Sequence, residues 1–289
     1  MDPVKKSLVT LHLAVVLLGG TGLFSKIIPL NAIDITLGRS LFACLALCLF
    51  VRAGREHLRL ERRLDYFIAV GLGVLMAAHW ATYFASMQYA GVSVGMIAMF
   101  TFPVITVLLE PLFEKTRLAW QDMLSALVVV IGIVLIVPEI SLDNDVTLGV
   151  GLGVISAVLY AVRNLSLRKY FSHYSGARSM AWQTLIIVLC LLPFSDLTST
   201  QQDTSVWLLL LALGTAFTAL SHALVANSLA HLRAKTFSLI ACMQPFYGVI
   251  FAIILLNESP GWQTLLGGIL VTSASIYETV NTHKSASAT

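Results

Sequence analysis

Ten apolar stretches, each about as long as a bilayer is thick, follow one another through the 289 residues of this chain. A helix that crosses a membrane needs about 20 consecutive, mostly apolar residues. Only 11% of the residues are charged, against roughly 25% in an average soluble domain. The sequence therefore predicts an all-α integral membrane protein with ten transmembrane helices. The stretches cover residues 8–29, 33–51, 64–88, 91–113, 118–138, 147–169, 177–195, 205–229, 234–257 and 261–280.

The basic residues alternate between the loops. Of 18 Lys and Arg, 15 lie in the loops and tails or within two residues of the end of an apolar stretch, and Lys26, Arg39 and Arg163 lie deeper. The others gather at the N-terminus, at the C-terminus and in the loops after the second, fourth, sixth and eighth stretches, while the charges of the remaining loops are acidic. Because Lys and Arg accumulate on the cytoplasmic side of spanning helices, we expect a multi-pass protein of a bacterial inner membrane with both termini cytoplasmic. The net charge of +3 reports this bias and does not indicate nucleic-acid binding.

An offset of 142 residues superposes the second half of the chain on the first. Pro103 falls on Pro245, Trp120 on Trp262, and Trp80 on His222. Since each half holds five stretches, the second copy must enter the membrane from the opposite side. We therefore expect two inverted five-helix repeats, at residues 1–140 and 145–284. In transporters such repeats place the substrate site near the midplane between the halves.

The repeated segments also carry a family resemblance. Residues 245–248 read Pro-Phe-Tyr-Gly, residues 257–260 read Asn-Glu-Ser-Pro, and a Gly-rich last helix begins at Trp262. This pattern resembles the end of an EamA domain, and the whole chain resembles the ten-helix EamA-type members of the drug/metabolite transporter superfamily. Arg39 matches an Arg that is common near the start of the second helix of this family. The first repeat departs from the pattern, because Thr116 stands in the place of Glu258. The resemblance implies a metabolite exporter.

Polar and aromatic residues inside the stretches are the candidates for substrate contact, because such groups are costly in lipid and mark transport paths. Arg39 either braces its helix or faces a substrate carboxylate. Arg163 either contacts substrate or forms a buried ion pair with Glu110, and such a pair would serve as a cytoplasmic gate or as a brace. The predicted substrate-binding residues are Arg39, His79, Trp80, Tyr83, Phe102, Tyr160, Arg163, Trp182, His222, Gln244 and Tyr247.

Two prolines and two histidines suggest moving parts. Pro103 and Pro245 each remove a helical hydrogen bond near the middle of a span, so we expect a kink in each half that also serves as a hinge. His79 and His222 occupy nearly equivalent positions of the two repeats. Imidazole titrates near neutral pH, so protons are a candidate coupling ion.

Enzyme chemistry has little support in the sequence. Residues 91–95 match the G-x-S-x-G pattern of serine nucleophiles, but that pattern is meaningful on a strand-to-helix turn, whereas here it joins two spans. The four cysteines all fall inside spans. We therefore expect no enzyme activity, no metal and no cofactor.

These observations favour a secondary transporter that works by alternating access and exports amino acids or related carboxylated compounds. The deeper charges are basic and no acidic residue lies at the centre of the expected cavity face. An organic-acid, sugar or nucleoside permease is the alternative within the class, and an intramembrane enzyme or a sensor is the alternative outside it. The expected partners are a small-molecule substrate, the lipid bilayer and protons as the candidate coupling ion, in a monomer or a homodimer.

Overall fold

The computed structural model of the chain describes residues 3–113, 118–137, 143–197, 202–229 and 240–286, and within them every regular element is a helix. The α-helices are α1 (Pro3–Gly20), α2 (Phe24–Ile27), α3 (Ala32–Ala53), α4 (Arg63–Ala90), α5 (Val92–Met99), α6 (Phe102–Phe113), α7 (Trp120–Ile136), α8 (Asp145–Tyr170), α9 (Gly176–Leu191), α10 (Thr204–Gly214), α11 (Ser221–Leu229), α13 (Gln244–Leu256) and α14 (Trp262–Ala286). Each predicted apolar stretch contains helix, so the all-α class is confirmed.

Polar side chains in the loops decide where several helices begin. Asn31 caps α3 by accepting a hydrogen bond from the Asp34 backbone N–H at 2.9 Å. Asn144 caps α8 by accepting from Val146 N at 2.9 Å. Ser175 caps α9 in the same way. Such residues satisfy N–H groups that the first turn of a helix leaves free, which is why the apolar runs start where these loops end.

Two spans are broken at equivalent places. In the first half α5 ends at Met99 and α6 begins at Phe102, with Pro103 in its first turn. In the second half α13 begins at Gln244, with Pro245 in its first turn. The backbone repeats the break at the 142-residue offset, since Ile105 N donates to Thr101 O and Tyr247 N donates to Met243 O, both at 3.1 Å. Each proline thus sits just after an interruption rather than inside a continuous helix.

Seven helical segments of the described residues are long and apolar enough to cross a membrane, α7 and α13 are shorter apolar helices, and α14 spans 25 residues. Large apolar side chains cover the outer faces of the bundle, as lipid requires. Examples are Leu49, Phe67, Leu127, Ile254 and Ile269. The number of ten spans stays a prediction.

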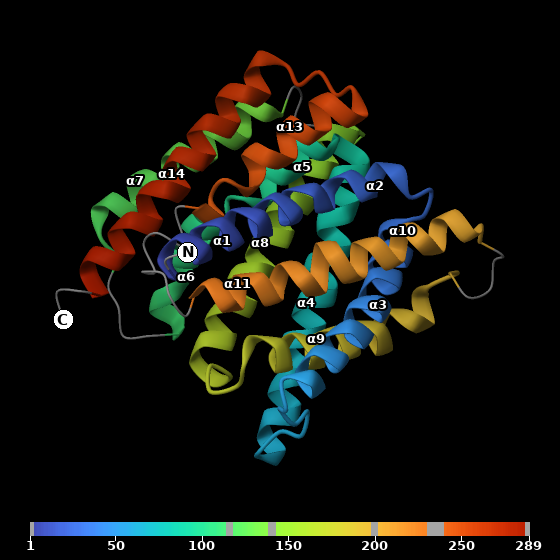
Figure 1. Cartoon of the computed structure of the whole chain (residues 1–289). Helices are drawn as coiled ribbons and strands as arrows, with labels where there is room; N and C mark the ends of the chain where they lie inside the picture. The colour runs from blue at the N-terminus through green and yellow to red at the C-terminus, as the bar shows by residue number, and fades with distance from the viewer. Residues whose placement is uncertain (1–2, 114–117, 138–142, 198–201, 230–239, 287–289) are drawn as a thin grey trace.

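The helices pack in matched pairs. With the 142-residue offset, α4 corresponds to α10–α11 and α8 corresponds to α1–α2. α4 packs along α8, and its counterpart α11 packs along α1. In the same way α4 contacts α9 as α10 contacts α3, while α7 and α14 pair with each other at the edge of the bundle (Figure 1). The two halves therefore face each other through equivalent surfaces.

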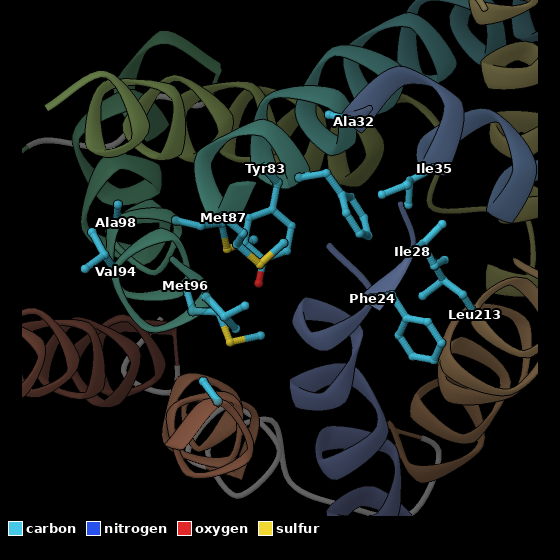
Figure 2. Close-up of a cluster of buried hydrophobic side chains, with 14 of the residues drawn as sticks. Phe24, Ile28, Ala32, Ile35, Tyr83, Met87, Val94, Met96, Ala98 and Leu213 are labelled. Carbon is cyan, nitrogen blue, oxygen red and sulfur yellow. The ribbon is translucent and has the colours of Figure 1, made fainter. Parts of the chain in front are cut away.

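The largest buried cluster joins both halves near the α4–α5 turn. Figure 2 shows Phe24 and Ile28 beside Leu213, and Met87 of α4 facing Met96 of α5. Small residues let α4 and α8 approach closely, as is usual for helices packed in lipid. A Cβ on Gly149 would lie 2.8 Å from Ala90 N, and Ser86 Oγ donates to Gly149 O at 2.6 Å. This packing holds α4 and α8 together beside the site described next.

Candidate functional site

A cavity of about 590 Å³ lies between the two halves. Its wall comes from α1, α3, α4, α6, α8, α9, α11, the residues around both helix breaks and the turn after α8. A volume of this size falls in the range of small-molecule pockets. Most of the predicted residues line it, namely Arg39, His79, Trp80, Tyr83, Phe102, Pro103, Tyr160, Arg163, His222 and Gln244.

Arg39 brings a buried positive charge to this wall. Its side chain is 3% exposed, and its guanidinium lies 4.0 Å from the centre of the Trp80 ring. One guanidinium nitrogen, Nη2, donates to Thr218 Oγ1 at 2.8 Å, whereas Nε has no hydrogen-bond partner. Thr218 belongs to a π-helical turn, Thr215–Leu220, a distortion that is frequent at functional sites. Arg39 is therefore held by a hydroxyl and an aromatic face.

Arg163 is held by neutral groups. Its Nε donates to Gln183 Oε1 at 2.7 Å, its Nη1 donates to Asn164 Oδ1 at 2.9 Å, and its Nη2 lies 3.3 Å from the Met180 sulfur. The ion pair with Glu110 that the sequence suggested is absent from the contacts described for Arg163. Glu110 instead pairs with Arg168 at 2.5 Å, because Arg168 lies more than one turn further along α8, at the end of the helix.

Aromatic rings form a continuous wall along one side of the cavity. His79 stacks on Tyr160 with ring centres 4.6 Å apart and lies parallel to Tyr83 at 6.1 Å. Tyr160 meets the edge of Phe102 at 4.9 Å, and Phe102 meets Phe100 at 5.5 Å. We call His79, Tyr83, Tyr160, Phe102 and Phe100 the ring wall. All five line the cavity.

The two histidines have different surroundings. His79 is 2% exposed, and its Nδ1 lies 2.8 Å from Ser156 Oγ and 3.0 Å from Ser156 O, on α8. His222 is less buried, and its Nδ1 lies 2.9 Å from Thr218 O, one turn earlier in its own span. Nδ1 of each ring is thus engaged with backbone or hydroxyl oxygen. Whether either ring carries a proton during transport stays a prediction.

The cavity reaches one end of the bundle. Leu167, Phe171, Tyr174 and Gly176, at the junction of α8 and α9, belong to its wall. Among the described residues, the wall includes none from the turn between α13 and α14 or from the α4–α5 turn at the opposite end. The sequence prediction places the α8–α9 junction on the cytoplasmic side.

Hydrogen bonds between the halves close the opposite end. Glu258, in the turn between α13 and α14, accepts from Val92 N at 2.7 Å, Ser93 N at 3.0 Å and Ser93 Oγ at 2.7 Å. Its carboxylate therefore caps the N-terminus of α5, where the helix dipole favours negative charge. These contacts give Ser93 of the G-x-S-x-G segment a structural role. Gly91 has φ 91°, and a Cβ there would lie 3.2 Å from the Glu258 carboxylate.

A second set of contacts fixes the same end within the first half. Gln88 donates through Nε2 to Leu30 O at 2.8 Å, and Lys26 Nζ donates to Gln88 O at 2.8 Å. These bonds tie the end of α4 to the connection between α2 and α3. Thr116, which occupies the place of Glu258 in the first repeat, lies outside the described residues, so no counterpart of the Glu258 cap is described there.

At the cavity's open end, the loop after α3 is fastened to the start of α9. Tyr174 donates through its hydroxyl to Asp65 Oδ2 at 2.6 Å and accepts from Glu61 N at 2.7 Å. Desolvation by burial and the bond to Asp65 raise the pKa of the Tyr174 hydroxyl above its usual value. Trp182 donates through Nε1 to Leu58 O at 2.8 Å. These hydrogen bonds connect α4 and the loop before it to α9 and the turn before it, beside the open end of the cavity.

Three predicted residues are not brought to the wall. Trp182 is occupied by Leu58 and by the edge of the Tyr66 ring at 5.2 Å. Tyr247 packs with Leu11 and Val15. Pro245 is buried at the start of α13, and its neighbour Gln244 lines the cavity in its place.

Sequence reasoning missed other wall residues. Phe100 and Cys242 both line the cavity, and each stands three residues before a repeated proline, which is the signal that could have found them. Thr218 is the partner of Arg39, but only the fold brings these two residues, 179 positions apart, into contact.

The charges of the site have one sign. Arg39 and Arg163 line the cavity, and among the described residues its wall includes no Asp or Glu. No group of three or more His, Cys, Asp or Glu in the described part of the chain could hold a metal ion. The arrangement suits an anionic group on the substrate, with the ring wall beside it.

Comparisons with known proteins agree with this architecture. Residues 5–137 and 147–277 each match the model of the EamA-like transporter family. An uncharacterized transporter, YxxF of Bacillus subtilis (strain 168), is 24% identical over 277 residues, which cover 92% of this chain and 86% of that protein. A chain in a solved crystal structure aligns over 97% of this chain and 98% of its own length, with a TM-score of 0.66 and 14% identity. At that identity the likeness shows the fold alone.

Proposed function

Because this chain belongs to the EamA-like transporter family and is a multi-pass membrane protein built from two EamA repeats, we propose that it is a secondary transporter that exports small carboxylated metabolites, with amino acids as the favoured substrates. The proposal includes an inverted arrangement of the repeats in a bacterial inner membrane, with both termini cytoplasmic. The matched helix pairs and the two equivalent helix breaks support the inversion.

One observation carries the substrate class. Arg39 is a buried cation on the cavity wall, and its described contacts include no carboxylate. A buried charge without a counter-ion is costly. An anion that entered the cavity would supply the counter-ion that Arg39 lacks. Guanidinium binds carboxylate through two parallel hydrogen bonds. A carboxylated substrate therefore fits this wall better than a cation.

The two ends of the bundle support alternating access as the mechanism. In this structure the cavity reaches the α8–α9 junction, while Glu258 and Gln88 hold the opposite end closed. In a transport cycle the open end must close and the closed end must open. The helix breaks before Pro103 and Pro245 are the places where each half can bend. With the α8–α9 end facing the cytoplasm, the observed state is the one that loads an exported substrate.

Flux into proteoliposomes tests this proposal. Purified protein is reconstituted and the uptake or release of radiolabelled amino acids is measured, with Arg39→Ala as the defective variant and Tyr89→Phe, at an exposed position of α4, as the matched control. We expect saturable flux that Arg39→Ala reduces at least tenfold, since a charged hydrogen bond contributes about 1.5–3 kcal/mol. The absence of flux for every amino acid and organic acid, or stronger binding of hydrophobic cations than of carboxylates, would contradict it.

A further inference from the structure

Two residues of the cavity wall each carry a buried polar atom without a hydrogen-bond partner. Tyr83 Oη and Arg39 Nε are both buried, and neither has a hydrogen-bond partner. Tyr83 is 4% exposed and Arg39 is 3% exposed, and both line the cavity. Buried polar groups are nearly always paired, so an unpaired one calls for a partner that the protein alone does not supply. Arg39 Nε and Tyr83 Oη can both donate a hydrogen bond, so one acceptor group in the cavity would suit both.

The elements around these atoms leave few places for that partner. Trp80 covers one face of the Arg39 guanidinium at 4.0 Å, and Phe84 lies 5.2 Å from it. Thr218, between α10 and α11, accepts a hydrogen bond from Arg39 Nη2. Tyr83 stands one turn after Trp80 on α4, and its ring meets the edge of Phe84 at 6.2 Å. In Figure 2 its hydroxyl oxygen points away from α4. Nε is thus the buried atom of this guanidinium that has no hydrogen-bond partner.

We propose that the Tyr83 hydroxyl and the Arg39 guanidinium together bind the substrate carboxylate, and that Tyr83 determines selectivity for a carboxylate over its neutral amide. Arginine presents a flat edge of N–H donors and tyrosine adds an O–H donor. A carboxylate has two oxygens with about four acceptor positions, so it satisfies both residues at once. A primary amide has one acceptor oxygen and turns an N–H group toward the second donor.

The ring wall then receives the rest of the substrate. Tyr83 is its first member, followed by His79, Tyr160, Phe102 and Phe100 in ring-to-ring contact. A carboxylate held at Tyr83 directs the attached body along these rings. The substrate class is a small carboxylate whose body is apolar and flat enough to lie against aromatic faces. This inference rests on the proposed function, because it assigns residues to the same cavity.

The experiment compares Tyr83→Phe with wild type and with Tyr89→Phe, the same substitution on the same helix at a position that is 49% exposed. Thermal shift in detergent and equilibrium binding are measured for phenylpropionate, for its primary amide and for cyclohexylpropionate. Removal of an unsatisfied hydroxyl leaves the ligand-free melting temperature unchanged or raises it. Tyr83→Phe weakens phenylpropionate binding about tenfold to a hundredfold, as expected for one hydrogen bond to a charged group.

The selectivity readout separates a binding role from a structural one. We expect the preference of wild type for acid over amide to fall about tenfold in Tyr83→Phe and to persist in Tyr89→Phe, and cyclohexylpropionate to bind more weakly than phenylpropionate. Equal weakening of acid and amide, a lower ligand-free melting temperature in Tyr83→Phe, or no binding of phenylpropionate to wild type overturns the inference. If Tyr83→Phe binds phenylpropionate normally while Arg39→Ala does not, the inference fails and the proposed function stands. If wild type transports no carboxylate, the proposed function fails as well.

Discussion

Glu258 is the residue whose loss should weaken the closed end of the bundle most clearly. Its carboxylate accepts three hydrogen bonds, from Val92 N, Ser93 N and Ser93 Oγ. A hydrogen bond to a charged group contributes about 1.5–3 kcal/mol, and loss of an N-cap costs about 0.5–2 kcal/mol. Glu258 is half-buried, so water replaces part of the lost hydrogen bonding. We expect Glu258→Ala to lower the free energy of unfolding by about 2–4 kcal/mol.

A graded series of variants tests this reasoning. Ser93→Ala removes one of the three bonds and should cost about 1 kcal/mol. Glu258→Gln keeps an acceptor oxygen but presents an N–H group to the remaining donors. Its loss of unfolding free energy should therefore lie between those of Ser93→Ala and Glu258→Ala. Ser259→Ala, at an exposed position in the same turn, serves as the control. The double variant Glu258→Ala/Ser93→Ala should be no less stable than Glu258→Ala alone, because the bond is already lost.

The assay is thermal unfolding of purified protein in detergent, followed by tryptophan fluorescence. A loss of about 2–4 kcal/mol should lower the melting temperature on the order of 5 °C or more. The loss should also favour opening of the closed end, which is measured as maleimide labelling of a cysteine placed at Val92, a buried residue at the start of α5. The cap does not stabilise the protein as the distances indicate if Glu258→Ala has the same melting temperature as the Ser259→Ala control. The same conclusion follows if the effects of Glu258→Ala and Ser93→Ala on stability simply add.

Three further predictions follow from other contacts. Gly267→Leu should separate α7 from α14 and reduce folded yield, because a Cβ there would lie 2.5 Å from Gly132 O, whereas Gly151→Ala, with no atom within 4 Å, should be neutral by the same thermal assay. Because the folded-state pKa of Tyr174 is raised, its contribution to stability is present below the usual tyrosine value of about 10 and is lost as pH rises through the raised value. Tyr174→Phe should flatten the alkaline fall in melting temperature, and an identical fall would contradict it. If protons couple transport through His79 or His222, single alanine variants should alter the pH profile of flux, and profiles that match wild type for both would remove that hypothesis.

Much of the architecture could be predicted because it follows from local properties of the chain. Apolar length set the helices, since a helix that satisfies its own backbone hydrogen bonds is the stable form of an apolar run in lipid. The caps at Asn31 and Ser175 are local as well, because each side chain accepts from an N–H group three residues further along the chain. The 142-residue offset pairs Pro103 with Pro245, so it relates the two helix breaks and the two halves of the chain through the sequence alone.

The site was predictable in its members and less so in its contacts. A buried polar residue inside an apolar span has few inexpensive places to go, which is why Arg39, His79, Arg163 and His222 were found from the sequence and share one cavity. Trp182 satisfied the same rule, but its indole N–H donates a hydrogen bond to Leu58 O in the loop after α3. The rule selects residues that need partners and does not say whether the partner is a ligand or Leu58 O.

Sequence alone thus determined the class of the protein, its apolar helices and its repeat, because each depends on neighbouring residues or on a pattern within the chain. Only the tertiary structure decided that Glu258 caps α5, that Arg168 rather than Arg163 pairs with Glu110, and that Thr218 holds Arg39. Those contacts join residues 58–179 positions apart. Their geometry depends on how helices pack at specific angles and distances, and no local pattern in the chain encodes that information.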